Sequence, residues 1–152
     1  MKCVLKFFIG ACLSIGFITG SYAGDKGTKD EAVTLVHKAI AFYKANGKDK
    51  AFAEVSNKSG QFVDRDMYVY ILDTNGTMMA HGANEKLIGK DLTNLKDADG
   101  KLFAQELIAH AKSKKAGWVD YKWPNPVTKQ IEAKTTYVEA FDGYGFAVGV
   151  YK

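Results

Sequence analysis

Cysteine is scarce in this chain of 152 residues, and both copies, Cys3 and Cys12, lie near the N-terminus. Two early lysines, an apolar run over residues 7–18 and the small-x-small segment Ser21-Tyr22-Ala23 are typical of a secretory signal peptide. Cleavage after this segment removes both cysteines. The exported chain would then have no disulfide, no thiolate nucleophile and no cysteine-ligated metal.

A long apolar run is also missing, because the stretch over 7–18 is shorter than the roughly 20 residues that span a bilayer. We therefore predict a signal peptide over 1–23 and a single domain over 24–152, periplasmic or secreted after cleavage. A retained membrane anchor is the first alternative, and lipidation at Cys12 is the second.

Strong net charge is absent as well. The formal charge of +4 falls to +2 without the first 23 residues, which hold two lysines and no acid. Basic and acidic residues are interspersed in the rest of the chain, so no nucleic-acid partner is predicted.

Sequence motifs for a cofactor or for hydrolysis are not found. The three histidines have no paired spacing, and Asp73-Thr74-Asn75-Gly76 lacks the downstream glutamate of a calcium loop. There is no Cys-x-x-Cys-His haem segment, no Gly-x-Ser-x-Gly elbow and no phosphate loop. The sequence therefore predicts no metal, no cofactor and no catalytic residue.

Three helices are predicted from apolar spacing. Thr28-Lys29-Asp30-Glu31 has the form of a capping box, and helical periodicity follows as far as a stop at Asn46-Gly47. A short helix is expected over 48–56, and a third over 102–111. The apolar stripe of the first helix, which includes Val36 and Ile40, suits either the core or a partner.

Five strands are predicted from β-branched and aromatic runs and from turn signals. They cover 67–72, 77–81, 117–123, 131–138 and 144–151, with a polar connection over 82–100. This order predicts an α+β, PAS-like fold, in which a five-stranded antiparallel sheet has N-terminal helices and a helical and loop crossover over the sheet.

The amino-acid sequences of several segments add to this pattern. These are residues 66–73 with Asn75-Gly76-Thr77, Ala80-His81, 87–92, 97–101, 117–126, 134–138 and 148–151. From about Lys29 to Lys152 the chain resembles the single-Cache domains of bacterial chemoreceptors and sensor kinases, which are PAS-like extracytoplasmic sensors.

The resemblance implies a pocket above the sheet that binds a small organic molecule, often a short carboxylate, and it implies no reaction chemistry. Family members usually continue into a membrane helix and a signalling module, whereas this sequence stops at Lys152. The expected partner is therefore a separate sensor kinase or chemoreceptor, and a homodimer through the first helix is a further expectation. Gly82 and Gly143-Tyr144 depart from the family pattern, which makes the ligand's identity hard to transfer.

Aromatic residues with polar tips are the first candidates for ligand binding. Alternation places Tyr121 and Trp123 on one face of their strand, and a buried hydroxyl or indole N–H needs a partner that a carboxylate can supply. Tyr70, together with Tyr68, and Tyr137 on a neighbouring strand are candidates for the same reason. Plain core packing is the alternative for all of them.

Lys134 and His81 complete the predicted site. Lys134 shares a strand face with Glu132 and Thr136, and a cation directed into a partly apolar cavity would give charge-assisted hydrogen bonds to an acid. The alternative is a solvated lysine paired with Glu132. His81 precedes the long connection, where a neutral imidazole either meets the ligand or orients the loop.

Three classes of function follow. The first is a ligand-binding sensor without enzymatic activity. The second is a small enzyme in which His81 with Asp73 or Asp120 forms an acid–base pair. The third is a protein-interaction module without a small ligand, which a filled core would favour.

Overall fold

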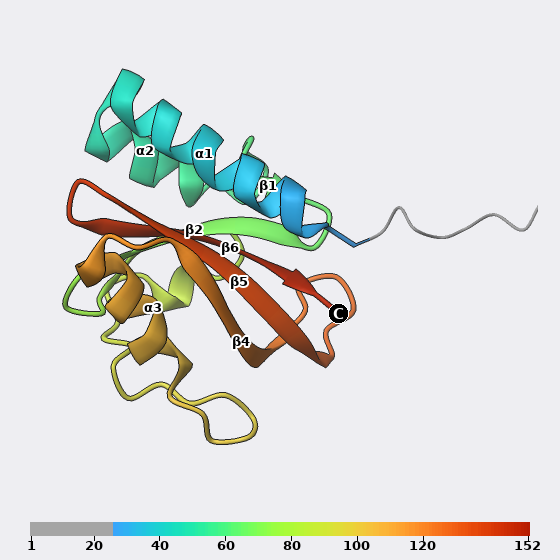
Figure 1. Cartoon of the computed structure of the whole chain (residues 1–152). Coiled ribbons are helices and arrows are strands. Elements are labelled where there is room, and N and C mark those ends of the chain that lie inside the picture. The colour runs from blue at the N-terminus through green and yellow to red at the C-terminus, as the bar shows by residue number, and fades with distance from the viewer. Residues whose placement is uncertain (1–25) are drawn as a thin grey trace, which may run out of the picture.

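Residues 26–152 are described by the structure, a computed structural model (Figure 1). The predicted signal peptide lies outside the described residues. Within them, no helix is both long enough and apolar enough to cross a membrane.

Helix α1 (Lys29–Asn46) begins at the predicted capping box. The Thr28 hydroxyl accepts a hydrogen bond from the backbone N–H of Glu31, whose carboxylate accepts one from the backbone N–H of Thr28. Gly47, with φ of 83°, separates α1 from the short helix α2 (Lys48–Val55). The apolar stripe of α1 packs into the core of the domain, where Val36, Ile40 and Tyr43 are buried.

The strands form one antiparallel sheet. They are β1 (Val63–Asp64), β2 (Met67–Asp73), β3 (Met78–His81), β4 (Gly117–Pro124), β5 (Ile131–Phe141) and β6 (Tyr144–Tyr151). Their order is β1-β2-β6-β5-β4, and β3 also pairs with β2. The five predicted strands are confirmed, and the two-residue β1 adds a sixth.

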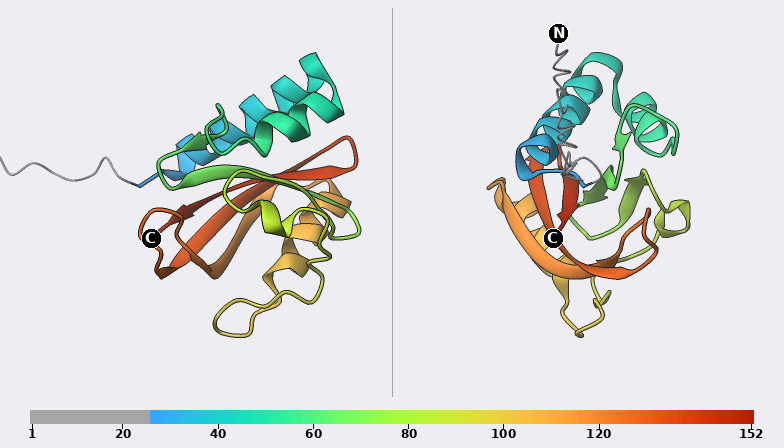
Figure 2. Two further views of the ribbon diagram at one scale, coloured as in Figure 1. Left: turned by 180° about the vertical axis from the view of Figure 1, so that it is seen from behind. Right: turned by 90° about the vertical axis from the view of Figure 1, so that its right-hand side faces the viewer.

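Helices cover both faces of this sheet (Figures 1 and 2). On one face, α1 and α2 pack over a cluster that includes Val69, Ile71 and Val148. On the other face, α3 (Phe103–Ser113) and the 82–101 connection cover a second cluster that includes the alternate residues Tyr68 and Tyr70. The sheet therefore separates two cores.

The connection between β3 and α3 is an ordered cover. It contains one short 3-10 helix, Glu85–Leu87. Backbone N–H groups of Gly89 and Met78 donate to the carbonyl oxygens of Met78 and Lys90, which holds the connection against β3, and the N–H of Leu92 donates to Gly76 in the turn between β2 and β3. These bonds keep its leucines over the sheet, where they close the second core.

Candidate functional site

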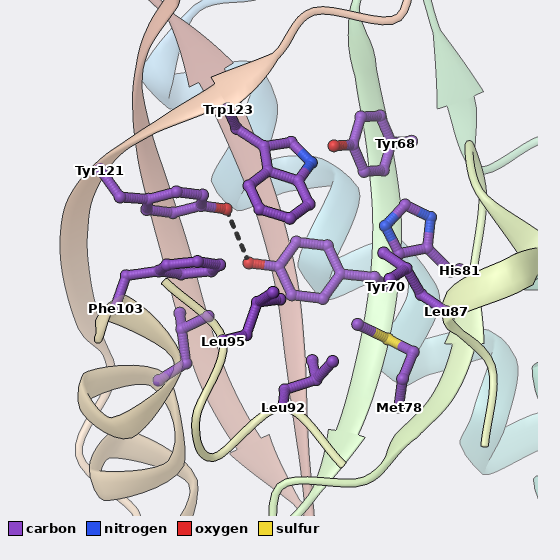
Figure 3. Close-up of a pocket in the computed structure, with 11 residues that line it drawn as sticks. Tyr68, Tyr70, Met78, His81, Leu87, Leu92, Leu95, Phe103, Tyr121 and Trp123 are labelled. Atoms are coloured by element: carbon purple, nitrogen blue, oxygen red, sulfur yellow. Dashed lines mark hydrogen bonds between the residues drawn. The ribbon is translucent and has the colours of Figure 1, made fainter. Parts of the chain in front are cut away.

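A small aromatic cavity lies between the sheet and the connection over 82–101 (Figure 3). It is lined by Tyr68, Tyr70, Met78, His81, Leu87, Leu92, Leu95, Phe103, Leu107, Tyr121 and Trp123. Its volume of about 20 Å³ is close to what a single water molecule needs. The side chains therefore nearly fill the site in this closed arrangement.

His81 closes one side of the cavity and also orients the covering loop. Its Nδ1 accepts hydrogen bonds from the backbone N–H groups of Ala83 and Asn84, at 3.1 and 2.9 Å. Burial, together with the nearby Lys134, lowers the pKa of His81 to about 3, so the ring is neutral. Because Nδ1 is an acceptor, the proton resides on Nε2, which is left as a donor.

Three hydroxyl groups meet on the opposite side. The Tyr121 hydroxyl lies 3.2 Å from that of Tyr70 and 3.0 Å from Oγ1 of Thr136. The Phe103 ring stacks on Tyr121 with centroids 4.1 Å apart and so fixes its orientation. Burial raises the pKa of Tyr121 to about 12, and it raises the pKa of Tyr70 as well, so both hydroxyls stay protonated.

Lys134 is fully buried directly behind the cavity wall. Its Nζ donates to the hydroxyl of Tyr68 at 2.7 Å and to that of Tyr151 at 3.3 Å. The Tyr151 hydroxyl donates in turn to the carbonyl oxygen of Pro124 at 2.8 Å. The Tyr68 oxygen accepts from lysine, and its own proton has only a long contact of 3.5 Å with the Tyr151 oxygen, so it can turn to a better acceptor in the cavity.

The path of the lysine side chain depends on Gly149. In the register of the sheet, Lys134 pairs with Tyr151, and Gly149 is the neighbouring residue of β6 on the same face. A Cβ atom at Gly149 would overlap the Lys134 side chain, so the missing side chain leaves room for the lysine stem to reach Tyr68 on β2.

Aromatic rings surround the Lys134 ammonium. Its Nζ lies 4.1 Å from the ring centroid of Tyr68 and 4.8 Å from that of Tyr151. Within residues 26–152 no carboxylate forms an ion pair with it. Burial lowers the pKa of Lys134 to about 7, and the negative charge of Asp66 opposes this shift.

The polar groups around the cavity are therefore mainly donors. On the side away from the paired Tyr70 and Tyr121 hydroxyls, they are Nε2–H of His81, the hydroxyl of Tyr68, the indole N–H of Trp123 and, behind them, the ammonium of Lys134. Figure 3 shows the indole nitrogen on the side of the Trp123 ring that faces Tyr68 and His81. An ionised carboxylate only accepts hydrogen bonds, so this arrangement is chemically matched to one.

A wider hollow of about 290 Å³ adjoins the cavity. The two share Tyr68, His81 and Trp123, which form the wall between them. Lys129 and Asn84 also line the outer hollow, and none of its lining residues is acidic. A movement of these shared side chains would join the two spaces.

The structure brings most of the predicted residues together. Tyr70, His81, Tyr121 and Trp123 line the cavity, and Lys134 lies one side chain behind it. The alternative of a solvated Lys134 is wrong, since the residue is 1% exposed. Tyr68, which the sequence groups with Tyr70, stands between Lys134 and the cavity.

Tyr137 does not reach the cavity. It lies on the opposite sheet face, where it contacts His37 of α1 and Trp118 and donates to Glu139 at 2.9 Å. As the neighbour of Thr136 on the same strand, it necessarily points to the other side of the sheet. Its placement among the cavity residues is corrected accordingly.

An acid–base pair at His81 is not formed. Asp73 accepts backbone hydrogen bonds from Asn75 and Thr77 in its own turn, and Asp120 is exposed and pairs with Lys152. Within residues 26–152 no group of three or more histidine, cysteine or acidic side chains is placed to hold a metal ion.

Comparison with known proteins gives a consistent result. The family profile of single Cache domain 2 matches residues 20–151. The methyl-accepting chemotaxis protein McpP of Pseudomonas putida is 38% identical over 86 residues, which cover 57% of this chain and 16% of McpP. The sensor histidine kinase MctS of Rhizobium johnstonii is 34% identical over 85 residues, 56% of this chain and 18% of MctS. The matched segments thus span less than a fifth of these relatives.

Solved structures show the same fold. A methyl-accepting chemotaxis protein from Vibrio parahaemolyticus superposes with a TM-score of 0.70 at 22% identity, covering 81% of this chain and 87% of that one. A Cache chemosensory domain, described in terms of carboxylic acid recognition, has a TM-score of 0.66 at 31% identity, with coverages of 80% and 91%.

Proposed function

Since the chain belongs to the single Cache domain 2 family, we propose that it is an extracytoplasmic sensor domain that binds a short carboxylic acid in the aromatic cavity. We propose further that it passes the signal to a chemoreceptor or sensor kinase, the two kinds of protein found among its relatives. The supporting observation is the set of donors that meets in front of the buried Lys134.

The charge pattern favours an acid over other small molecules. The lining side chains supply Nε2–H of His81 and the Tyr68 hydroxyl, and no acidic side chain lines the cavity. Bringing an anion close to Lys134 gives it a counter-charge that the described residues do not supply within ion-pair distance. The related Cache domain described in terms of carboxylic acid recognition supports the same choice.

The size of the cavity requires that binding opens it. A volume of about 20 Å³ does not admit a carboxylate with its carbon chain. The outer hollow has room for such a molecule and shares its wall with the cavity. We propose that the acid enters from the outer hollow and displaces Tyr68 and Trp123, while the covering loop shifts Leu87.

The test is isothermal titration calorimetry with a panel of two- to six-carbon mono- and dicarboxylates, with amines and sugars as comparison compounds. Lys134→Met removes a charge-assisted hydrogen bond, and Tyr68→Phe removes the hydrogen bond of a hydroxyl. Each variant is expected to bind the acid with about 10- to 100-fold lower affinity. Tyr137→Phe is the matched control, because Tyr137 lies on the other sheet face. Equal affinity in all four proteins would contradict the assignment of the site.

A second candidate function is a protein-interaction module without a small ligand, which the nearly filled cavity favours. Native mass spectrometry of the protein purified from the periplasm distinguishes the two. A bound acid that is recovered chemically unchanged supports the sensor and argues against an enzyme. No adduct and no response to the panel would favour the interaction module.

The export of the chain is a proposal with its own test. A mature N-terminus at Gly24, found by sequencing the protein from the periplasmic fraction, is the expected result for a cleaved signal peptide. An uncleaved N-terminus would contradict it.

A further inference from the structure

Asp66 lies just before β2 and is 1% exposed. Its Oδ1 accepts a hydrogen bond from the backbone N–H of Gly27 at 2.8 Å. Its Oδ2 is buried and has no hydrogen-bond partner among residues 26–152, where no other buried side-chain nitrogen or oxygen is left in this condition. A buried carboxylate oxygen without a partner is costly and calls for a role.

The position of Asp66 points to Lys134. Asp66 lies in the turn between β1 and β2, and the register of β2 with β6, in which Val69 is opposite Val148, places it level with Tyr151, the sheet partner of Lys134. Tyr68 is the residue whose hydroxyl accepts the hydrogen bond from Lys134. Asp66 also shares a surface hollow with Asn125, next to the Pro124 carbonyl that holds Tyr151.

Lys134 itself needs a counter-charge. The titratable groups that face it are Tyr68 and Tyr70 of β2, Tyr121 of β4, Tyr151 of β6, His81 of β3 and Asp66. The tyrosines and the histidine are neutral at pH 7, since their pKa values are shifted away from it. Asp66 is thus the acidic group of this set.

We propose that Asp66 is the counter-charge that raises the proton affinity of Lys134, so that a larger fraction of the lysine is an ammonium before a carboxylate ligand binds. The proposal rests on the proposed function, and it makes Asp66 a positioning residue that acts through Lys134 without touching the ligand. The negative field of the free oxygen offsets part of the burial cost of the ammonium. A larger fraction of the sites is then cationic when an acid arrives, and binding requires less proton uptake from solution.

The first test needs no ligand. Lysine labelled with ¹³C and ¹⁵N at the side-chain terminus allows the protonation of Lys134 to be followed by NMR against pH. In Asp66→Asn, which keeps the Oδ1 acceptor for Gly27, the midpoint of Lys134 should fall by about one pH unit or more. Asp64→Asn, which removes an exposed carboxylate two residues away, should leave it unchanged.

Asp66→Ser is a second neutral variant in case Asp66→Asn does not fold. The proposal would be overturned if the titration midpoint of Lys134 moved no further in either Asp66 variant than in Asp64→Asn. Oδ2 would then have no electrostatic effect on the lysine.

The second test uses acetate as the probe. At pH 7.5 the affinity of Asp66→Asn for acetate should be about five- to tenfold lower than that of the wild type, with more protons taken up on binding. At pH 5.5, where Lys134 is protonated in both proteins, the variant should bind at least as tightly. A loss of affinity of the same size at both pH values would indicate a merely structural role and refute the proposal. If the wild type binds no acid, the proposed function fails, while the NMR titration still decides the role of Asp66.

Discussion

Replacement of Lys134 by methionine is expected to stabilise the domain at neutral pH, although it removes a cation from the candidate site. The ammonium is fully buried among aromatic rings, and burial lowers its pKa to about 7 from an ordinary value of 10.5. Such a shift means that the fold disfavours the charged form relative to the unfolded chain.

The magnitude follows from that shift. At about 1.4 kcal/mol per unit, the penalty on the charged lysine is on the order of 5 kcal/mol below pH 7. Between pH 7 and 10.5 the unfolded chain binds the proton and the fold does not, so stability rises with pH by up to about 1.4 kcal/mol per unit. Methionine removes the penalty but also loses the bonds to Tyr68 and Tyr151, which offsets about 1 to 3 kcal/mol.

Urea denaturation followed by tryptophan fluorescence, at fixed pH values from 7 to 9.5, measures this effect. The wild type should gain stability across the range, whereas Lys134→Met should start higher and stay flat. Lys122→Met, which removes an exposed lysine, is the control and should follow the wild type. The reasoning is refuted if Lys134→Met shows the wild-type slope or is less stable at pH 7.

Three further outcomes are expected. Gly149→Ala should cost about 1 to 3 kcal/mol in urea denaturation, because the new methyl group meets the Lys134 stem, and Lys134→Ala in the same chain should relieve part of the loss. The fold should lose stability as pH falls below about 6.5 toward 3, because the unfolded chain protonates His81 and the fold does not; His81→Asn should reduce this loss in acid denaturation. Thr28→Ala should cost about 1 kcal/mol in thermal denaturation by removing the cap of α1, and an unchanged midpoint would contradict this.

Local signals in the sequence were sufficient for most of the fold. The capping box at Thr28 and the turn at Asp142-Gly143 act over a few residues, so they predict a helix start and a hairpin without tertiary information. The strand Val63–Asp64 was missed because two residues carry no alternation that distinguishes a strand from a loop.

The site was less predictable for a geometric reason. Alternation divides a strand into two sets of residues, but it does not say which set faces α1, and Tyr137 was therefore placed on the wrong side. The burial of Lys134 depends on Gly149 and Tyr68, which come from two other strands. No local pattern marked Asp66 as part of the site, since an unpartnered carboxylate oxygen is recognised only when its neighbours are known.

The separation of the two cores by one sheet has a consequence for how such a domain diversifies. Val69 and Val148 belong to the core beneath α1, while Tyr70 and Ala147, each next to one of them in sequence, belong to the cavity side. Substitutions on the cavity side can change what the domain recognises while the packing under α1 continues to supply folding free energy. One scaffold can in this way accept new chemical signals through mutations at alternate positions of the same strands.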